Sequence, residues 1–334
     1  MRYIMIGAGA IGGAIGGRLF DSGHEVVLVA RGAHLAAVRA HGLRLELADG
    51  ERRLPIPAVQ GPAELTARDD DVLVLGVKTQ DTPAVLETWG AYGEGTAGGG
   101  PGAGPAVVCA QNGVENERLA LRRFGRVYGA CVWLPATFLE PGVVSALCAP
   151  LTGMLHLGRY PSGSDATVRA IAADLTAAGF AAPVTEDVMA WKYAKLLSNL
   201  GNAVDAVLGS DAGAGAGQDA GRELTARARA EGAAVLAAAG IAYIGTEQQA
   251  RTRGDRVESP SAKPSSTWQS LARGTGSIES DYLNGEIVLL GRRFGVPVPV
   301  NEALQHAANR AARERRAPGE LTAQERAALL TAGG

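Results

Sequence analysis

Short apolar runs recur through the amino-terminal half of the chain, with polar and glycine-rich stretches between them. Residues 2–6 form the first run, and residues 26–29, 71–77 and 107–109 continue the series. Runs of this length, without the alternation of a half-exposed strand, are typical of strands buried on both faces of a parallel sheet. Residues 13–22 have a helical pattern instead. This half is therefore predicted to be an α/β fold.

The pattern changes near residue 186, after two further strand-like stretches at 126–133 and 154–157. Beyond that point apolar residues recur at helical spacing. A chain of 334 residues also exceeds the size that one hydrophobic core usually serves. We therefore expect two domains, an α/β domain over residues 1–185 and an all-helical domain over residues 186–334.

Residues 189–209 are expected to form one amphipathic helix. Its apolar positions gather on one side, whereas Lys195, Asn199 and Asn202 gather on another. Only 4 of the 32 basic residues in the chain are lysines, so a lysine beside two amides is notable. Such a face is typical of a helix that lines a cleft, and the alternative is an ordinary helix with a short polar face. Lys192 lies on a different side and is expected to contact no more than phosphate or solvent.

A second helix is expected at residues 278–292, with Glu279 at the edge of its buried stripe. A carboxylate is rarely buried without a partner, and the scarce Lys195 is a candidate for that partner. Otherwise, Glu279 only complements the helix dipole. Between the two helices, Ser265 and Ser266 follow a proline. They either present hydroxyl groups to a carboxylate or cap the helix that follows.

The turn after the first apolar run carries the pattern GxGxxG, between a strand and a helix. In this setting the first glycine permits a tight turn, the second lets a pyrophosphate approach the backbone, and the third lets the helix pack on the strand. The N–H groups at the helix start then face the phosphates. The alternative is a glycine-rich turn without a ligand. We expect a dinucleotide to bind at Gly7, Ala8, Gly9, Ala10, Ile11 and Gly12.

The end of the second apolar run indicates which dinucleotide binds. NAD sites usually carry an Asp or Glu there for the ribose 2′-hydroxyl, but this chain has Arg31. A guanidinium group can bind a 2′-phosphate through two parallel hydrogen bonds, whereas a carboxylate would repel it. Arg31 therefore favours NADP over NAD, and the alternative is an exposed arginine in a loop.

Lys78 and Asn112 follow the next two apolar runs. Ligands of parallel sheets bind at the carboxyl ends of the strands, so both residues are site candidates by position. As alternatives, Lys78 is a solvated loop lysine and Asn112 is part of an Asn-Gly turn.

Composition argues against several classes of partner. The net charge of −2 offers no broad basic surface for nucleic acid. No run reaches the roughly 18 apolar residues of a membrane helix, and the start of the chain lacks the features of a signal peptide. Cys109, Cys131 and Cys148 lie in apolar surroundings without metal-ligand spacing, so we expect reduced thiols and no metal site. These features predict a cytoplasmic protein that acts on small molecules.

Taken together, these residues resemble the ketopantoate reductase family, also called 2-dehydropantoate 2-reductases. The likeness extends over nearly the whole chain. It rests on the glycine motif with Arg31, residues 77–79, residues 111–113, Trp191 with Lys195 and Asn199, Ser265 with Ser266, and residues 279–285. The order and spacing of the last two groups are unusual outside the family.

The resemblance implies a site and a reaction. NADPH would lie in a cleft between a Rossmann domain and an all-helical domain like the C-terminal domain of 6-phosphogluconate dehydrogenase. It would reduce a 2-keto acid to the 2-hydroxy acid. Lys195 would donate the proton, and Glu279 would orient Lys195 or the substrate. Asn112 and Asn199 would help to place substrate and nicotinamide, and one of the two serines would hold the substrate carboxylate.

One position departs from the family pattern. Members often carry a second Asn eight residues after the catalytic Lys, where it contacts substrate, but this chain has Ala203 there and Asn202 one place earlier. The identity of the keto acid therefore does not follow from the resemblance.

Other functions and assemblies stay open at this point. One alternative is an imine- or opine-forming reductase of the same architecture, and another is a non-enzymatic NADP-sensing protein. Short-chain dehydrogenases are excluded, because they use a Tyr four residues before Lys and no lysine here has one. The protein is expected to be a monomer or a homodimer.

Overall fold

The protein divides into two compact units, which we describe separately. The computed structural model describes residues 1–94, 104–209, 216–254, 256–258, 265–274 and 276–332. The first unit comprises residues 1–192 with 245–261, and the second comprises residues 193–244 with 262–334. Residues 186–192 thus group with the first unit, whereas the domain boundary that we expected lies at residue 185.

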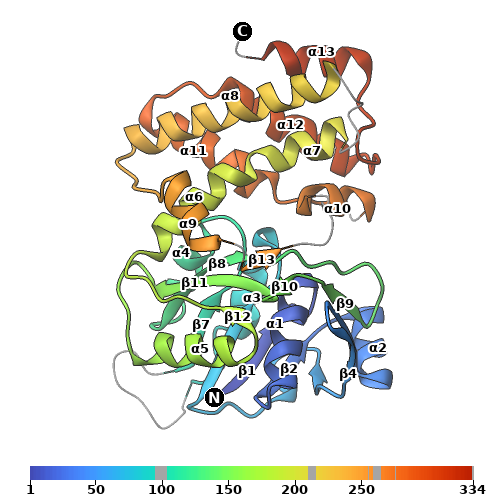
Figure 1. Ribbon diagram of the computed structural model, residues 1–334, viewed down its shortest axis with the longest axis vertical. Helices are drawn as coiled ribbons and strands as arrows, with labels where there is room; N and C mark the ends of the chain where they lie inside the picture. Colours follow the sequence, from blue (N-terminus) through green and yellow to red (C-terminus); the bar gives the residue numbers. More distant parts are fainter. Residues whose placement is uncertain (95–103, 210–215, 255, 259–264, 275, 333–334) are drawn as a thin grey trace. The chain divides into compact units, whose positions relative to one another are not determined.

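An eight-stranded sheet is the framework of the first unit (Figure 1). Its strand order is β12-β11-β8-β7-β6-β1-β2-β5. Neighbouring strands are parallel except β8 and β11, which are antiparallel. The strands are β1 Arg2–Ile6, β2 Glu25–Val29, β5 Ala58–Val59, β6 Asp71–Leu75, β7 Ala106–Cys109, β8 Val127–Trp133, β11 Gly153–Arg159 and β12 Phe180–Ala181. The expected α/β class with a parallel sheet is confirmed.

Helices and two small sheets complete this unit. Its helices are α1 Ala10–Asp21, α2 Gly32–His41, α3 Thr82–Trp89, α4 Asn116–Leu121, α5 Ala166–Ala177 and α9 Thr246–Arg253, with short 3-10 helices at η1 Pro62–Glu64 and η2 Thr79–Asp81. One small sheet has the order β4-β3-β9, and the other pairs β10 with β13. These strands are β3 Leu43–Leu47, β4 Gly50–Leu54, β9 Val143–Ala146, β10 Ala149–Pro150 and β13 Val257–Glu258.

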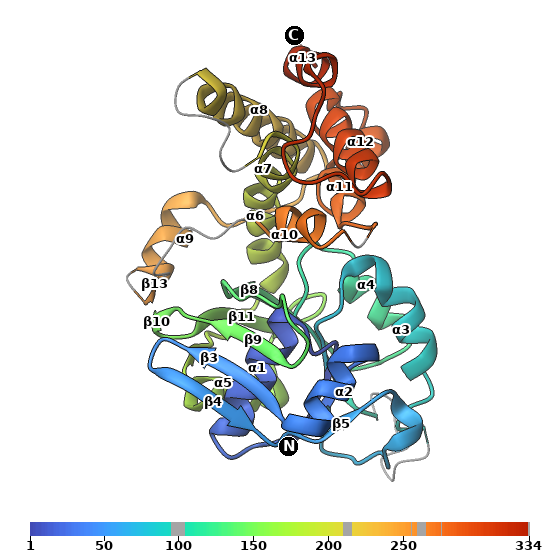
Figure 2. The same ribbon diagram turned by 90° about the vertical axis from the view of Figure 1, so that its right-hand side faces the viewer.

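Strand β1 shows why the apolar runs are continuous. Successive side chains of a strand point to opposite faces of its sheet. Tyr3 and Met5 accordingly join the core that includes residues of α1 and α5, whereas Ile4 and Ile6 join the core that includes residues of α3 and α4. Figure 2 shows these two pairs of helices on opposite sides of the sheet. Because both faces are covered, every position of β1 is buried.

The second unit is helical. Helix α6, Val188–Asn199, begins in the first unit and continues into the second. The other helices of the second unit are α7 Gly201–Leu208, α8 Ala216–Ala238, α10 Ser266–Ala272, η3 Ser280–Tyr282, α11 Asn284–Phe294, α12 Pro299–Arg313 and α13 Ala323–Thr331. Within the described parts of the chain, no helix combines the length and the apolar character needed to cross a membrane.

The single helix expected at residues 189–209 is interrupted at Leu200, so that expectation is wrong. Helix α6 ends at Asn199 and α7 starts at Gly201. The Leu200 carbonyl accepts a hydrogen bond from the Asn284 side chain at 3.2 Å, and the same amide group donates to Asn301 Oδ1 at 3.0 Å. A buried side-chain amide thus contacts the backbone at the junction of α6 and α7.

The helix expected at residues 278–292 also differs. The 3-10 helix η3 comes first, and Leu283, with φ −114° and ψ −90°, separates it from α11. Glu279 precedes both, as the residue before η3. The helical projection that placed Glu279 at the edge of a buried stripe therefore does not apply, although its side chain is partly buried.

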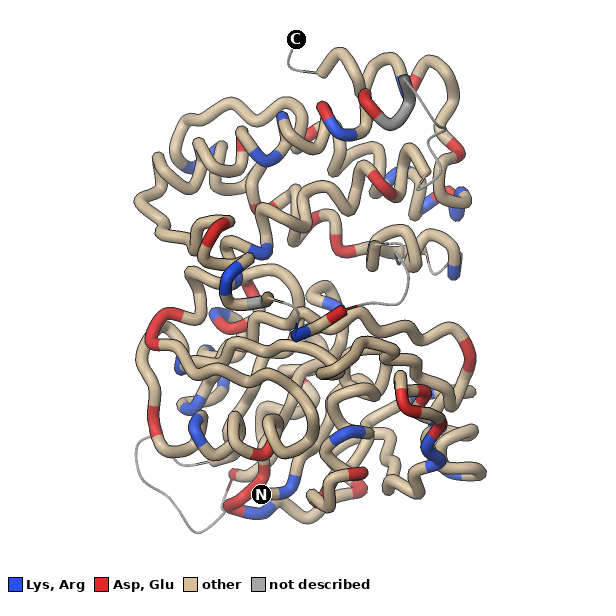
Figure 3. The backbone as a smooth tube through the Cα atoms, viewed as in Figure 1, with Lys and Arg blue, Asp and Glu red and all other residues tan. Residues whose placement is uncertain are grey.

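Charged side chains of both signs are interspersed in each unit (Figure 3). Arg68 and Glu25 pair at 2.7 Å in the first unit, and Arg316 and Glu325 pair at 2.8 Å in the second. The charges thus offset one another locally, and pairs of this kind near the surface typically add little to stability.

Candidate functional site

The glycine-rich loop lies between β1 and α1, and close backbone packing explains two of its glycines. Gly7 has a φ of +98°, and a Cβ there would lie 2.7 Å from Val77 Cγ1 and 2.8 Å from the Val77 nitrogen. A Cβ on Gly12 would lie 2.1 Å from the Gly7 carbonyl oxygen. Neither position can carry a side chain without moving the loop.

Gly9 differs from both, because a Cβ there would meet nothing within 4 Å. It is the N-cap of α1, it provides no side-chain cap, and the first turn contains no acidic residue. The N–H groups of this turn and the positive end of the helix dipole can therefore receive an anion. A dinucleotide pyrophosphate fits this loop, and the open space at Gly9 is where it can approach the backbone.

Gly76 belongs to the same packing and was not identified from the sequence. It follows β6 and donates its N–H to the Ile6 carbonyl at 2.9 Å. A Cβ on Gly76 would lie 3.0 Å from the Gly7 oxygen and 3.2 Å from the Gly12 Cα. A glycine directly after a buried strand is the sequence signal that could have indicated this close approach.

Arg31 lies two residues after the end of β2, as the N-cap residue of α2. Its side chain is exposed, and within the part of the chain that the structure describes it makes no ion pair. No carboxylate occupies the end of β2, because Ala30 is the only residue between Val29 and Arg31. A guanidinium group in this place can bind a phosphate.

Lys78 and Asn112 occupy the loops after β6 and β7, and both side chains are partly buried. A network of buried polar side chains joins these loops. Asn116 Nδ2 donates to the Asn112 carbonyl at 3.0 Å and to Thr79 Oγ1 at 3.1 Å, and Thr79 Oγ1 donates to the Asn112 carbonyl at 3.2 Å. The two loops are therefore held together at the carboxyl edge of the sheet, where ligands of such folds bind.

Two further side chains extend this network. Thr82 Oγ1 donates to Asn116 Oδ1 at 2.8 Å, and Gln111 Nε2 donates to Thr82 Oγ1 at 2.8 Å. Thr79, Thr82 and Asn116 have no exposed surface. The hydrogen bonds of this buried network hold the backbone that carries Lys78 and Asn112.

In the second unit, Lys195 and Asn199 are partly buried and lie one turn apart on α6. The Asn199 Nδ2 is buried and has no hydrogen-bond partner among the described residues. An unpaired buried amide donor costs free energy unless a ligand or water accepts from it. The arrangement therefore suits a polar group bound beside Lys195.

The two serines have different roles in the structure. Ser265 Oγ accepts the Trp268 N–H at 3.2 Å, which caps α10, and it donates to the Asn202 carbonyl at 3.3 Å. The Ser265 N–H donates to Asp205 Oδ2 at 3.0 Å. Ser266 is the first residue of α10 and is exposed. Capping thus accounts for Ser265, whereas the Ser266 side chain is accessible.

Lys192 is not a solvent-facing residue, so that expectation is wrong. Its ammonium group forms an ion pair with Glu117 of α4, and the two side chains are 2% and 0% exposed. Removing one member of such a pair leaves an uncompensated buried charge, which typically costs about 3–5 kcal/mol. The amino-terminal part of α6, residues 188–192, is therefore anchored within the first unit by a buried charge pair.

Other buried groups lie beside the amino-terminal part of α6. Trp191 stacks on His156, with ring centroids 3.7 Å apart, and its carbonyl accepts from Cys131 Sγ at 3.4 Å. Burial lowers the pKa of His156 to about 4, so the ring is neutral at pH 7. Burial and the nearby Glu117 raise the pKa of the Cys109 thiol. These groups are packed into the core and provide no accessible nucleophile.

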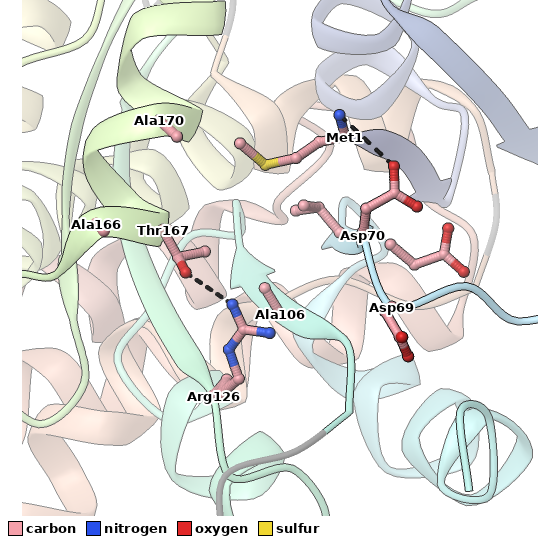
Figure 4. A pocket seen from close by; sticks show the side chains of 10 residues that line it. Met1, Asp69, Asp70, Ala106, Arg126, Ala166, Thr167 and Ala170 are labelled. Atoms are coloured by element: carbon pink, nitrogen blue, oxygen red, sulfur yellow. Dashed lines mark hydrogen bonds and ion pairs between the residues drawn. The ribbon is translucent and has the colours of Figure 1, made fainter. Parts of the chain in front are cut away.

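The pocket in Figure 4 lies at the opposite edge of the sheet, by the amino ends of β6, β7 and β8. Its volume is about 290 Å³. The Met1 ammonium group lies 3.7 Å from Asp70, and Arg126 donates to Thr167 Oγ1 at 2.7 Å. These groups of the pocket thus contact other residues of its lining, away from the glycine-rich loop. The lining residues are Met1, Asp69, Asp70, Asp71, Val72, Ala106, Arg126, Ala166, Thr167 and Ala170.

Cysteines and metal ligands add little to the site. The three cysteines are free and buried. In the described residues, His, Cys, Asp and Glu side chains form no group of three or more that could hold a metal ion.

Comparison with known proteins gives a consistent result over both units. Residues 3–161 match the model of the family described as ketopantoate reductase PanE/ApbA, and residues 187–312 match its C-terminal domain. The chain is 31% identical to a 2-dehydropantoate 2-reductase of Mesorhizobium japonicum, over 94% of this chain and 99% of the relative. It is 27% identical to that of Pyrococcus horikoshii, over 90% of this chain and 94% of the relative.

Solved structures agree on the fold. A PanE/ApbA family ketopantoate reductase from Ralstonia eutropha JMP134 has a TM-score of 0.75 and 28% identity, over 94% of this chain and 99% of that one. D-mandelate dehydrogenase, solved with NADH and anilino(oxo)acetate, has a TM-score of 0.79 and 22% identity over the same shares of the two chains. With two matching domain models and relatives that span nearly the whole length, the chain belongs to the ketopantoate reductase family.

Proposed function

We propose that this protein reduces a 2-keto acid to the 2-hydroxy acid with NADPH, and that Lys195 is the general acid. The substrate is 2-dehydropantoate or a relative of it. The observation that carries the proposal is the division between the two lysines of α6. Lys192 is committed to a buried ion pair, whereas Lys195 is partly exposed and lies one turn from the unpaired amide of Asn199.

In the first unit, two regions would bind the cofactor: the start of α1, and the loops that follow β2, β6 and β7. The start of α1, at Gly9, Ala10 and Ile11, would bind the pyrophosphate, and Arg31 would bind the 2′-phosphate. Lys78 and Asn112 would contact the cofactor from the loops that the buried amide network holds together. When bound, NADPH supplies the hydride for C2 of the keto acid.

In the second unit, the side chains would stabilise the charge that develops on the substrate. The Lys195 ammonium group donates a hydrogen bond and then its proton to the carbonyl oxygen. Asn199 donates to the substrate, and Glu279 orients Lys195 or the substrate. Because the Ser265 hydroxyl caps α10, we assign the substrate carboxylate to Ser266.

Ala203 bears on the choice of keto acid. Its side chain is a buried methyl group, and an alanine offers no amide to a polar substrate tail. A site that lacks a hydrogen-bonding partner gives up the discrimination that the bond would provide. We therefore propose that the protein either reduces 2-dehydropantoate with a high KM or prefers a 2-keto acid with a bulkier and less polar tail.

The proposal also includes the location of the protein and its partners. The free, buried cysteines suit a reducing cytoplasm. The protein would act on small molecules, as a monomer or a homodimer.

The test is an assay of NADPH oxidation with a panel of 2-keto acids, including 2-dehydropantoate and 2-ketoisovalerate, each with and without added amine. We expect turnover with at least one keto acid in the absence of amine. Turnover only in the presence of amine would indicate an imine- or opine-forming reductase instead. Binding of NADPH without any turnover would favour a sensing protein.

A further inference from the structure

His34, in the first turn of α2, is a buried histidine that the proposed reaction does not use. Its ring lies 2.8 Å, at Nε2, from the Ala8 carbonyl oxygen in the glycine-rich loop. On the other side of the ring, Nδ1 accepts the Gly142 N–H at 2.8 Å. The Phe138 ring packs against it, with centroids 4.6 Å apart. One side chain thus joins the loop, α2 and the segment before β9.

These two bonds define the protonation of the ring. The Gly142 N–H is a donor, so Nδ1 must be unprotonated, and the Ala8 carbonyl is an acceptor, so Nε2 must carry the proton. Both bonds form only with the neutral Nε2–H tautomer. Burial lowers the pKa of His34, which favours the neutral ring.

The Ala8 carbonyl belongs to the same peptide unit as the Gly9 N–H. In a trans peptide these two groups point in opposite directions, so holding the carbonyl fixes the direction of the N–H. Gly9 itself restricts this peptide little, because it has no Cβ and nothing lies within 4 Å of where one would be. Without another contact, the peptide could therefore turn at little cost.

We propose that His34 is a positioning residue for the dinucleotide: by donating to the Ala8 carbonyl, it holds the Ala8–Gly9 peptide so that the Gly9 N–H is presented to the pyrophosphate. The inference rests on the binding of a dinucleotide at this loop. Because His34 is three residues after Arg31 on the same turn, the contact also ties the pyrophosphate loop to the segment that would recognise the 2′-phosphate.

The charged groups around the ring do not replace its role. On its own element the nearest in sequence is Arg31, which is exposed. On the segment that carries Gly142 it is Glu140, whose side chain is 76% exposed and lies 4.0 Å from Arg44. The glycine-rich loop has no titratable side chain. Protonation of His34 would place an N–H opposite the Gly142 N–H, so acid should disturb this contact directly.

Two conservative variants separate the two bonds. In His34→Gln, the side-chain amide nitrogen takes the place of Nε2 and can still donate to Ala8. In His34→Asn, the amide oxygen takes the place of Nδ1 and can accept from Gly142, but it cannot reach Ala8. His34→Ala removes both bonds. His41→Ala is the matched control, since His41 is an exposed histidine on the same helix.

The measurement is the Kd for NADP⁺ and NAD⁺ by titration of the full chain, with the thermal unfolding of each unliganded variant. At neutral pH we expect His34→Ala and His34→Asn to bind both cofactors about ten-fold more weakly, His34→Gln to stay within about three-fold of the unaltered protein, and His41→Ala to be unchanged. Both cofactors should lose affinity, because they share the pyrophosphate.

A pH series of NADP⁺ affinity provides a readout that would not change if His34 had only a structural role. The folded pKa of His34 lies below its ordinary value, so the neutral form and tight binding persist at neutral pH and are lost as pH falls through that lowered pKa. The unaltered protein should lose affinity for NADP⁺ on acidification more steeply than His34→Gln, in which the 2′-phosphate still titrates but the ring is absent.

The outcomes distinguish failure of the proposed function from failure of the role assigned to His34. If the unaltered protein binds neither cofactor, the proposed function fails and there is no dinucleotide for His34 to position. If the unaltered protein binds, but the Gln and Asn variants bind equally well, the contact with Ala8 has no such role. Equal pH dependence of the unaltered protein and His34→Gln would also overturn the inference.

Discussion

Two successive turns of α6 show how one helix can use the same residue type in opposite ways. Lys192, in its amino-terminal part, is buried and paired with a carboxylate that is itself buried. Lys195, one turn later, is partly exposed and has an unpaired amide in the next turn. A buried ammonium group with a fixed partner anchors structure, whereas an accessible one can transfer a proton. Burial, more than residue type, therefore separates the two roles.

The largest expected effect tests the anchoring end of this comparison. Lys192→Met leaves Glu117 buried without a counter-ion, so we expect a loss of about 3–5 kcal/mol in the stability of the first unit. Glu117→Gln should cost a similar amount. The double variant should recover most of the loss, because no unpaired charge remains.

Denaturant unfolding of the single and double variants measures this coupling. Spectroscopic probes of the first unit are needed, because a protein with two compact units does not have to unfold in one step. Additive losses in the double variant would show that the pair does not act as a unit. The folded fraction of Lys192→Met should nevertheless keep near-normal kcat.

The next prediction concerns the cofactor and leaves α6 unchanged. Arg31→Ala should weaken NADPH binding by roughly 1.5–3 kcal/mol, or about 10- to 150-fold, because a charged hydrogen bond to the 2′-phosphate is lost. NADH binding should stay nearly the same. Equal affinity of the unaltered protein for NADPH and NADH would refute the assignment.

The smallest effect is expected at Ala203, just beyond the break after α6. Ala203→Asn should shift kcat/KM toward 2-dehydropantoate, relative to 2-ketoisovalerate, by about 1 kcal/mol if one neutral hydrogen bond is gained. Ala203→Leu is the control, because it has a similar shape without the amide. Since Ala203 is buried, the stability of both variants should be measured as well.

Strong discrimination between the two keto acids by the unaltered protein would contradict this substrate prediction. If it already prefers 2-dehydropantoate over 2-ketoisovalerate by a large factor, another residue provides the hydrogen bond. Asn202 is the first candidate, because its carbonyl contacts the capping Ser265 and so lies beside the start of α10.

The glycine-rich loop could be predicted from the sequence because its requirements are local. Gly7 needs a positive φ, and Gly12 packs on a carbonyl only five residues earlier, so a short motif carries the information. The order of strands and helices in the first unit follows from apolar runs for the same reason.

Contacts between segments that are distant in the sequence could not be predicted in this way. Glu117 and Lys192 are 75 residues apart, and His34 and Gly142 are 108 apart. No pattern along the chain shows that they meet. The break at Leu200 was missed because apolar periodicity continues through it, and only the fold brings the Asn284 amide to the Leu200 carbonyl.

Chemical rescue of Lys195→Ala tests the central claim most directly. Loss of a positioned acid should lower kcat by about 10²–10⁴, with NADPH affinity roughly intact. Added ethylamine should restore part of kcat, because its ammonium form can occupy the space of the missing side chain, whereas Lys192→Ala should not respond to it. Failure of any small amine to rescue Lys195→Ala, or equal rescue of Lys192→Ala, would contradict the assignment of Lys195 as the general acid.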